Sequence, residues 1–384
     1  MEISEILNHI GEEPENYFNA VAPPIMQTSN FYFDTVQEMR CAIQNEFDES
    51  TYTRGKNPTV AILRKKLAAL EGAEDALVLA SGCAAISSSI IANVKSGDHI
   101  ICVQSPYGWT TSLLTKLLPR FGVETTFVDG SKTENFESAI QKNTSVIYLE
   151  SPNSFTFELQ DLKAISSLAK SKNIITIIDN SYSTPLHQNP LKFGIDIVVH
   201  TASKYLSGHS DVVAGVICGS NQTIRKIFAS EFMTLGGIVS PFDAWLMIRG
   251  LRTLSIRLER STQSAMKVMD FLENHPKVEK IFYPFHPSNP QINLAKKQMN
   301  SGNGMFTVIF KCESRERMEA FCNTLKVFRM AVSWGGHESL IAPVVSFTEE
   351  HEYSDLPWNM IRFYVGLDEP DLLNKDLEQA LSPL

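Results

Sequence analysis

The order of strand-like and helix-like segments predicts an α/β fold whose sheet is mostly parallel and flanked by helices. Between about residues 60 and 220, short β-branched runs alternate with helical patterns, which is typical of parallel sheets covered by helices. The N-terminal segment has no strong period, and the C-terminal segment combines helices with short strands. We therefore expect an arm at 1–55, a main α/β domain at 56–243 and a small α+β domain at 244–384.

Six runs of the main domain have the length and the β-branched composition of buried strands. They are ALVLA (76–80), HIICV (99–103), TSVIYLE (144–150), IITIIDN (174–180), IDIVVH (195–200) and VVAGVIC (212–218). The last two runs leave no room for a helix between them, so part of the sheet is expected to be antiparallel. Helical patterns lie at 84–95, 110–121, 161–172 and after Pro241, and the small domain has strand-like runs at 305–310 and 360–365.

The bulk composition limits the classes of function. The net charge of −9 is spread over 384 residues without a basic patch, which argues against nucleic acid or anionic membrane as a partner. No run approaches the roughly 20 apolar residues that span a bilayer, and the acidic N-terminus lacks a signal core. The six cysteines are scattered without a CxxC pair, so we expect free thiols, no metal site and a cytoplasmic location.

Four groups at predicted strand exits carry the chemistry, because ligands of open α/β sheets bind beyond the carboxyl ends of the strands. Gly82 and Cys83 open a helix where a phosphate could bind, Asp179 ends a strand, and Tyr107 could stack on a flat ring. Lys204 follows a strand and lies among the hydroxyl residues Thr201, Ser203 and Ser207. Each feature by itself is common in turns, caps or surfaces. Together they supply the phosphate cradle, ring-nitrogen carboxylate, stacking ring and Schiff-base amine that pyridoxal phosphate requires.

At these residues the sequence closely resembles the Cys/Met-metabolism family of fold-type-I pyridoxal-phosphate enzymes, which includes cystathionine β-lyases, cystathionine γ-lyases, cystathionine γ-synthases and methionine γ-lyases. The resemblance runs from YTRGKNPT (52–59) to RFYVGLDEPDLLNKDLEQAL (362–381), and its densest part is DIVVHTASKYLSGHSDVVAG (196–215). SPFDAWLMIRGLRTL (240–254) and SWGGHESL (333–340) agree in order and spacing. The resemblance implies pyridoxal 5′-phosphate as cofactor and a mixed, mostly parallel sheet of seven strands.

The family's catalytic residues carry over to three positions. Lys204 resembles the Schiff-base lysine, Asp179 the pyridinium partner, and Tyr107 the ring-stacking tyrosine that the family also uses in proton transfer. The phosphate is implied to bind Gly82, Cys83, Thr201 and Ser203 of one subunit together with Tyr52 and Arg54 of its neighbour. The resemblance therefore implies a homo-oligomer with shared active sites, a dimer of dimers in our interpretation.

The substrate residues carry over less completely. Arg362 falls where the family binds the substrate α-carboxylate, a task suited to a guanidinium, and Ser333 lies beside it. Many members have ESPxNP where this chain has ESPNSFTFE (150–158). The carboxylate-binding Asn of the family is therefore either Asn153 in a shifted register or replaced by Ser154.

Three positions bear on the choice of substrate, and they resemble different branches of the family. Trp334 of SWGG resembles the bacterial β-lyase branch, as does the ESPxSxTxE form, whereas Val332 resembles methionine γ-lyases. Trp109 stands where the family has Gly or Cys. If Trp109 and Val332 line the pocket, apolar sulfur substituents are favoured, and a distal ammonium would need an acidic partner such as Glu338.

We therefore expect a carbon–sulfur lyase that acts on cystathionine-like or S-substituted cysteine substrates by β-elimination, with pyruvate, ammonia and a thiol as products. Elimination or replacement at Cγ stays an alternative, because it uses the same residues. An aminotransferase of the same fold is a third interpretation.

Overall fold

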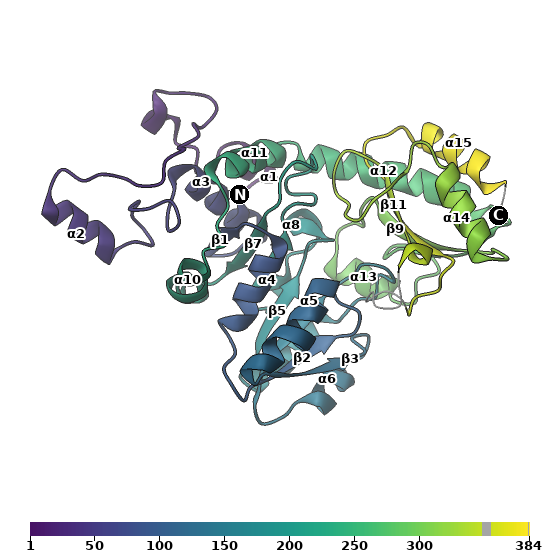
Figure 1. Ribbon diagram of the computed structural model, residues 1–384, viewed down its shortest axis with the longest axis horizontal. Helices are drawn as coiled ribbons and strands as arrows, with labels where there is room; N and C mark the ends of the chain where they lie inside the picture. The colour runs from purple at the N-terminus through teal and green to yellow at the C-terminus, as the bar shows by residue number, and fades with distance from the viewer. Residues whose placement is uncertain (348–354, 383) are drawn as a thin grey trace.

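The chain forms two sheets in this computed structural model, which describes residues 1–347, 355–382 and 384. Within those residues the main domain has a seven-stranded sheet of order β1-β7-β6-β5-β4-β2-β3 (Figure 1). Its strands are β1 (Asp75–Leu79), β2 (His99–Val103), β3 (Glu124–Val128), β4 (Thr144–Glu150), β5 (Ile175–Asp179), β6 (Ile197–Thr201) and β7 (Gly215–Gly219). Strand β7 is antiparallel to both of its neighbours, and the other pairs are parallel. The predicted fold class and the antiparallel part of the sheet are confirmed.

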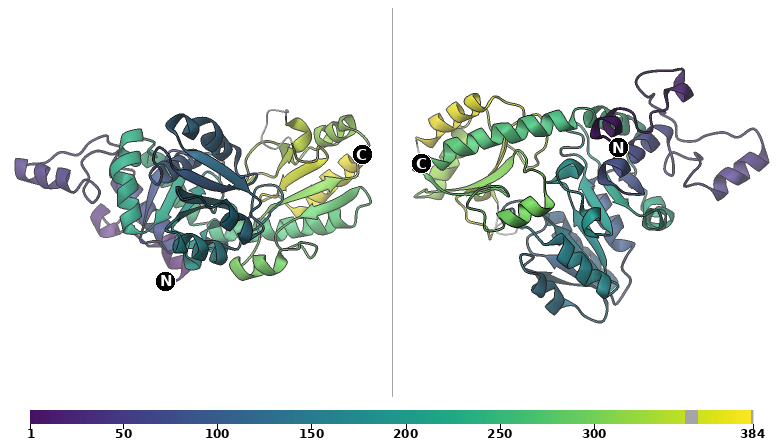
Figure 2. Two further views of the ribbon diagram at one scale, coloured as in Figure 1. Left: turned by 90° about the horizontal axis from the view of Figure 1, so that it is seen from below. Right: turned by 180° about the vertical axis from the view of Figure 1, so that it is seen from behind.

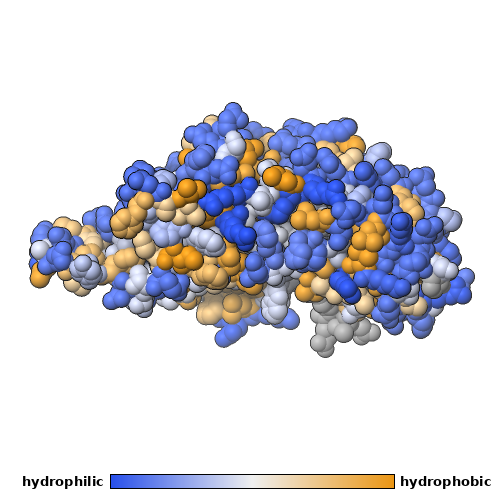
Figure 3. Space-filling view, turned by 90° about the horizontal axis from the view of Figure 1, so that it is seen from above, coloured by the Kyte–Doolittle hydropathy of each residue, from blue (hydrophilic) through white to orange (hydrophobic). Residues whose placement is uncertain are grey.

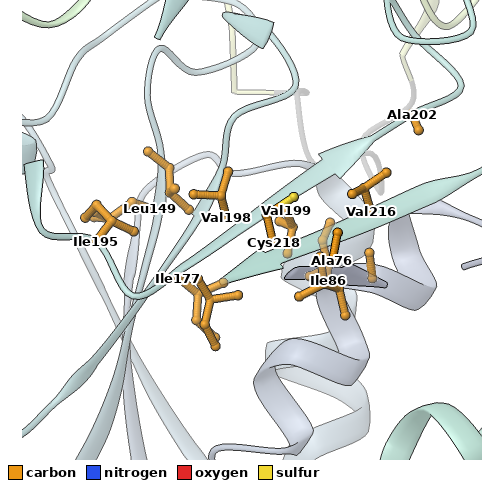
Figure 4. Close-up of a cluster of buried hydrophobic side chains, with 14 of the residues drawn as sticks. Ala76, Ile86, Leu149, Ile177, Ile195, Val198, Val199, Ala202, Val216 and Cys218 are labelled. Carbon is orange, nitrogen blue, oxygen red and sulfur yellow. The ribbon is translucent and has the colours of Figure 1, made fainter. Parts of the chain in front are cut away.

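The central strands form where the sequence has apolar runs, because helices cover the sheet and exclude water. Figure 4 shows the packing of α4 (Gly82–Ile91) beneath strands β1, β6 and β7, where Ala76, Ile86, Val198 and Val216 are almost fully buried. Burying one such aliphatic side chain contributes roughly 1.5–3 kcal/mol. Helices α3 (Pro58–Glu71), α6 (Thr133–Ala139) and α7 (Leu162–Ser171) also pack against the sheet.

The main domain has one strand that was not predicted, and the helix predicted at 110–121 is present but irregular. Strand β3 was not predicted, because it lies at the edge of the sheet and its sequence ETTFV is only partly buried. The predicted helix 110–121 is a chain of three short elements. These are α5 (Gly108–Ser112), a π turn (Leu113–Leu117) and a 3₁₀ turn (Leu118–Phe121) that contains Pro119. Proline lacks a backbone N–H and therefore breaks a regular α-helix.

A second sheet builds the C-terminal part of the molecule, with strand order β10-β11-β12-β9-β8 in the described residues. Its strands are β8 (Val278–Phe282), β9 (Met305–Phe310), β10 (Arg329–Met330), β11 (Leu340–Pro343) and β12 (Met360–Tyr364). Phe306 and Phe363 stack in its core with ring centroids 5.3 Å apart. The two predicted strands of this part are confirmed as β9 and β12. Helix α11 (Pro241–Leu251) and the long α12 (Leu254–Glu273) lead from the first sheet to the second (Figure 1).

The N-terminal segment projects from the body, as Figures 1 and 2 show from three directions. It carries α2 (Val36–Gln44), which a capping box formed by Thr35 and Glu38 stabilises at its N-terminus. Figure 3 shows hydrophobic residues at the surface of this projection. Phe18 and Tyr32 are among the large side chains of the segment that are exposed. An isolated segment of this kind gains little from apolar burial within its own chain.

The first dozen residues do not belong to the projection. Helix α1 (Ile3–Asn8) buries Ile6 and Leu7 next to α3. The buried ammonium of Lys66 donates hydrogen bonds to the carbonyls of both residues, and it lies 3.0 Å from the Glu12 carboxylate. These contacts tie the beginning of the predicted arm (1–55) to the main domain. In the described residues, no helix is long and apolar enough to cross a membrane.

Candidate active site

A cavity of about 230 Å³ opens at the carboxyl ends of β4, β5 and β6, where side chains from the second sheet close it. Parallel strands end at one edge of their sheet, so groups far apart in the sequence meet there. Eight predicted site residues line the cavity: Tyr107, Ser154, Asp179, Thr201, Lys204, Ser333, Trp334 and Arg362. The sequence prediction that these groups converge is in agreement with this geometry.

Lys204 projects into the cavity just beyond β6. Its Nζ lies 2.5 Å from Ser333 Oγ and 5.5 Å from the centroid of the Trp334 ring. Burial, with the Arg362 charge as a smaller cause, lowers the pKa of Lys204 to about 8. The loop after β10 packs directly on the lysine backbone, because a Cβ at Gly335 would lie 3.0 Å from Lys204 Cα. Gly335 also has a φ of +90°, which favours glycine.

The lowered pKa of Lys204 predicts that this side chain destabilises the fold of the cofactor-free protein by a free energy that depends on pH. Since the pKa is about 8 in the folded chain and 10.5 as a reference value, the unfolded chain binds more protons between these values, and stability rises with pH across that window. We expect Lys204→Met to stabilise the cofactor-free protein by about 3 kcal/mol at pH 7. The gain should shrink as the pH rises from 8 to 10.5, as urea unfolding can measure. A gain that does not depend on pH would contradict this prediction.

Two buried carboxyl groups stand side by side at the strand ends. Asp179 ends β5 and Glu150 ends β4, and they are register partners in the parallel ladder. Burial raises the pKa of Asp179, against the hydrogen bond that its Oδ1 accepts from the Ser181 N–H at 2.9 Å. Burial and the neighbouring Asp179 charge raise the pKa of Glu150 to about 8. Glu150 was missed in the sequence, although it ends an apolar run just as Asp179 does.

The start of α4 lies against the end of β6. A Cβ at Gly82 would come within 2.2 Å of Thr201 Oγ1, so only glycine lets the helix N-terminus approach this closely. Ser81 caps the helix by accepting the Ala84 N–H at 3.0 Å. A helix N-terminus beside a hydroxyl group can hold a phosphate.

Two of the predicted phosphate ligands have other contacts in the structure. The Ser203 hydroxyl donates to the Ala214 carbonyl at 3.3 Å and accepts the Ala214 N–H at 3.0 Å, and Ser203 does not line the cavity. Cys83 Sγ lies 3.9 Å from Tyr107 Oη, and burial raises the pKa of the Cys83 thiol. A contribution of Cys83 to anion binding would therefore come from its backbone N–H, as the sequence predicts.

Arg362 supplies the guanidinium on the side of the second sheet. It is buried on β12 and lies over the Phe155 ring, with 4.8 Å between Cζ and the ring centroid. Phe155 in turn meets Phe347 edge to face at 6.0 Å. A cation held on an aromatic face keeps a fixed orientation for a carboxylate. Phe155 and Phe347 line the cavity and were not predicted, because nothing in their local sequence indicates that they meet Arg362.

The two candidates for the replaced Asn differ in position. Ser154 lines the cavity, whereas Asn153 does not. Asn153 is buried in its own loop, where its side-chain oxygen accepts hydrogen bonds from the N–H and the hydroxyl of Thr156 at 3.1 and 3.0 Å. The geometry thus favours Ser154 as the residue that can meet a substrate carboxylate.

The outer wall of the cavity is apolar. Trp109 and Val332 both line it and are 66% and 79% exposed, so they stand at the mouth. Among the described lining residues, the acidic groups are Glu150 and Asp179. The candidate Glu338 does not line the cavity, and its carboxylate accepts the Ser210 hydroxyl at 2.6 and 2.8 Å.

Tyr52 and Arg54 lie outside this cavity, on the projecting N-terminal segment. Both side chains are exposed, and the Arg54 guanidinium lies 5.5 Å from the Tyr52 ring centroid. Within one chain they are therefore not brought together with Lys204.

The groups in the cavity fit pyridoxal 5′-phosphate. A half-buried amine whose pKa is lowered to about 8 can bind an aldehyde, and Asp179 can pair with a ring nitrogen. The close approach at Gly82 leaves a helix N-terminus for a phosphate. In the described residues, no group of three or more His, Cys, Asp or Glu side chains could hold a metal ion.

Comparisons with known proteins agree with this geometry. The protein family described as "Cys/Met metabolism PLP-dependent enzyme" matches this chain over residues 5–382. The chain is 42% identical to an L-methionine gamma-lyase of Porphyromonas gingivalis, over 96% of this chain and 94% of the relative. It is 34% identical to the cystathionine beta-lyase MetC of Bacillus subtilis, over 95% and 92%. The crystal structure of metB from Corynebacterium glutamicum superposes with a TM-score of 0.93 at 33% identity, covering 99% of this chain and 98% of that one.

Proposed function

The chain belongs to the family of Cys/Met metabolism PLP-dependent enzymes, and from this we propose that it cleaves sulfur amino acids whose sulfur carries an uncharged substituent. It is a carbon–sulfur lyase with pyridoxal 5′-phosphate as cofactor, and its substrate is an amino acid. The apolar wall formed by Trp109 and Val332 supports the choice of substituent.

We assign the roles in the reaction as follows. When bound, the cofactor draws the electrons released at the substrate Cα into its ring. Lys204 would be the covalent attachment point of the cofactor. Once the substrate's amino group has displaced it, the freed Lys204 amine would take the Cα proton, for which a pKa of about 8 is suitable. Asp179 keeps a proton on the ring nitrogen, and Tyr107 packs on the ring. Arg362 binds the substrate carboxylate, and Ser154 and Ser333 orient it.

The substrate proposal depends on Trp109 and Val332, which line the mouth of the cavity. A distal ammonium, as in cystathionine, would lose part of its water at the cavity mouth and would find no acidic partner there among the described lining residues. This partial desolvation is unfavourable, and at an exposed site the Trp109 ring face could return about 0.5–1 kcal/mol of it. A methyl or other small alkyl group on sulfur carries no such cost.

The position of the sulfur decides the type of elimination. With sulfur on Cβ, the thiolate leaves after one proton is removed, and pyruvate is formed; this β-elimination is our first proposal. With sulfur on Cγ, as in methionine, a second proton must leave Cβ first. The 42% identity to an L-methionine gamma-lyase favours γ-elimination of methionine as the second candidate.

The substrate proposal is tested by comparing kcat/KM for S-methylcysteine, methionine and cystathionine and by identifying the keto acid. We expect the two S-methyl substrates to compete well with cystathionine. Pyruvate from S-methylcysteine would indicate β-elimination, and 2-oxobutyrate from methionine γ-elimination. Trp109→Gly should raise kcat/KM for cystathionine about tenfold relative to kcat/KM for the two S-methyl substrates, because it opens the cavity mouth to a longer group. A wild-type preference for cystathionine of roughly a hundredfold or more would contradict the proposal.

We further propose that the enzyme is a homo-oligomer, a dimer of dimers, in which the arm (1–55) completes the neighbour's site. The division into a cofactor-binding domain (56–243) and a small domain (244–384) is part of the same proposal. The exposed apolar side chains of the arm support it, because a partner subunit would bury them. A cytoplasmic location is also proposed, since the six cysteines are free thiols.

A further inference from the structure

Glu150 connects two segments of the site. Its Oε2 accepts the Tyr107 N–H at 2.7 Å, and its Oε1 lies 3.1 Å from the Ser154 hydroxyl oxygen. Tyr107 precedes α5, and Ser154 belongs to the loop after β4. The side chain is 5% exposed and lines the cavity. None of the reaction roles described above uses it.

The surroundings of Glu150 favour an uncharged carboxyl group near neutral pH. Asp179 is its register partner on β5. The buried Cys102 thiol lies on β2, the neighbour of β4, and the Glu150 charge is one cause, after burial, of the raised pKa of that thiol. A neutral carboxyl group has one acceptor oxygen and one O–H donor. These match an N–H donor at Tyr107 and a hydroxyl oxygen at Ser154, since a hydroxyl accepts as well as it donates.

We propose that Glu150 is a positioning residue that, as a neutral carboxyl group, holds the Tyr107 segment and the Ser154 loop at a fixed distance from each other. The aromatic ring that packs on the cofactor and the hydroxyl that meets the substrate carboxylate then keep one relative placement. A neutral Glu150 also leaves Asp179 as the charged member of the pair, as a partner of a protonated ring nitrogen must be. This inference rests on the roles of Tyr107 and Ser154 in the proposed function.

The test compares Glu150→Gln with Glu150→Ala in the holoenzyme. Glutamine has the same length and presents one acceptor and one donor group, so it should restore both contacts, whereas alanine removes them. For Glu150→Ala we expect KM to rise about tenfold with a smaller change in kcat, and the visible circular dichroism of the bound cofactor to fall by about half. For Glu150→Gln both quantities should stay within about twofold of wild type. Glu124→Gln, the same change at an exposed glutamate on β3, is the matched control.

A Glu150→Gln enzyme as impaired as Glu150→Ala would overturn the proposal, since it would mean that the negative charge is required. An unchanged Glu150→Ala enzyme would overturn it as well. If the Glu150→Ala protein does not fold, Glu150→Asp provides the test instead. Aspartate keeps the carboxyl group, but its side chain is one methylene too short, so KM should rise as expected for alanine. If wild type and Glu124→Gln cleave no sulfur amino acid, the proposed function fails, while the dichroism series still tests the positioning role.

Discussion

Lys204→Ala is expected to lose turnover by at least about a thousandfold, because the substitution removes both the attachment point of the cofactor and the base at Cα. The wild-type protein should be yellow, and reduction with borohydride should fix the cofactor on Lys204. Peptide mapping by mass spectrometry locates the adduct. The half-buried position of Lys204 beside Ser333 and its pKa of about 8 are the physical basis of this expectation.

Lys95→Ala is the matched control, because its side chain is 84% exposed and lies outside the cavity. It should leave the colour and the rate unchanged. An adduct on any lysine other than Lys204 would refute the central assignment, and so would a Lys204→Ala enzyme that retains a tenth of the activity or more.

Mixing Arg54→Ala subunits with Lys204→Ala subunits is expected to restore activity that neither variant has alone. If the arm completes the neighbour's site, a hybrid dimer has one site with both lesions and one site with neither. After full exchange of equal amounts, roughly a quarter of all sites should be intact. The specific activity of the mixture is measured, and differently tagged subunits are used to monitor the exchange of subunits.

A mixture of Arg54→Ala and Tyr52→Ala subunits controls this experiment. Both lesions lie on the arm, so every site of every dimer receives a damaged arm, and no recovery is expected. No recovery in the test mixture after proven exchange would show that Arg54 acts within its own chain. Recovery in the control would show that Tyr52 and Arg54 of one arm do not serve the same site. The exposed positions of Tyr52 and Arg54, away from the cavity of their own chain, motivate the prediction.

The central strands were predictable because they are buried on both faces, which demands continuous apolar runs. The runs 99–103 and 144–150 coincide with β2 and β4. The edge strand β3 has one partly solvated side and a mixed sequence, so the same criterion missed it. The helix predicted at 110–121 is present but irregular, because Pro119 lacks the backbone N–H that a regular α-helix needs.

The sequence by itself determined the family, the cofactor and the main residues around Lys204, because a reacting amine, a ring carboxylate and a phosphate cradle each require a particular side chain or glycine. Only the tertiary structure decided which groups meet across elements. It placed Ser154 in the cavity and Asn153 outside it, and it set Phe155 against Arg362. It also brought Glu150 beside Asp179. Such contacts depend on strand register and loop path, which long-range packing determines and local sequence does not.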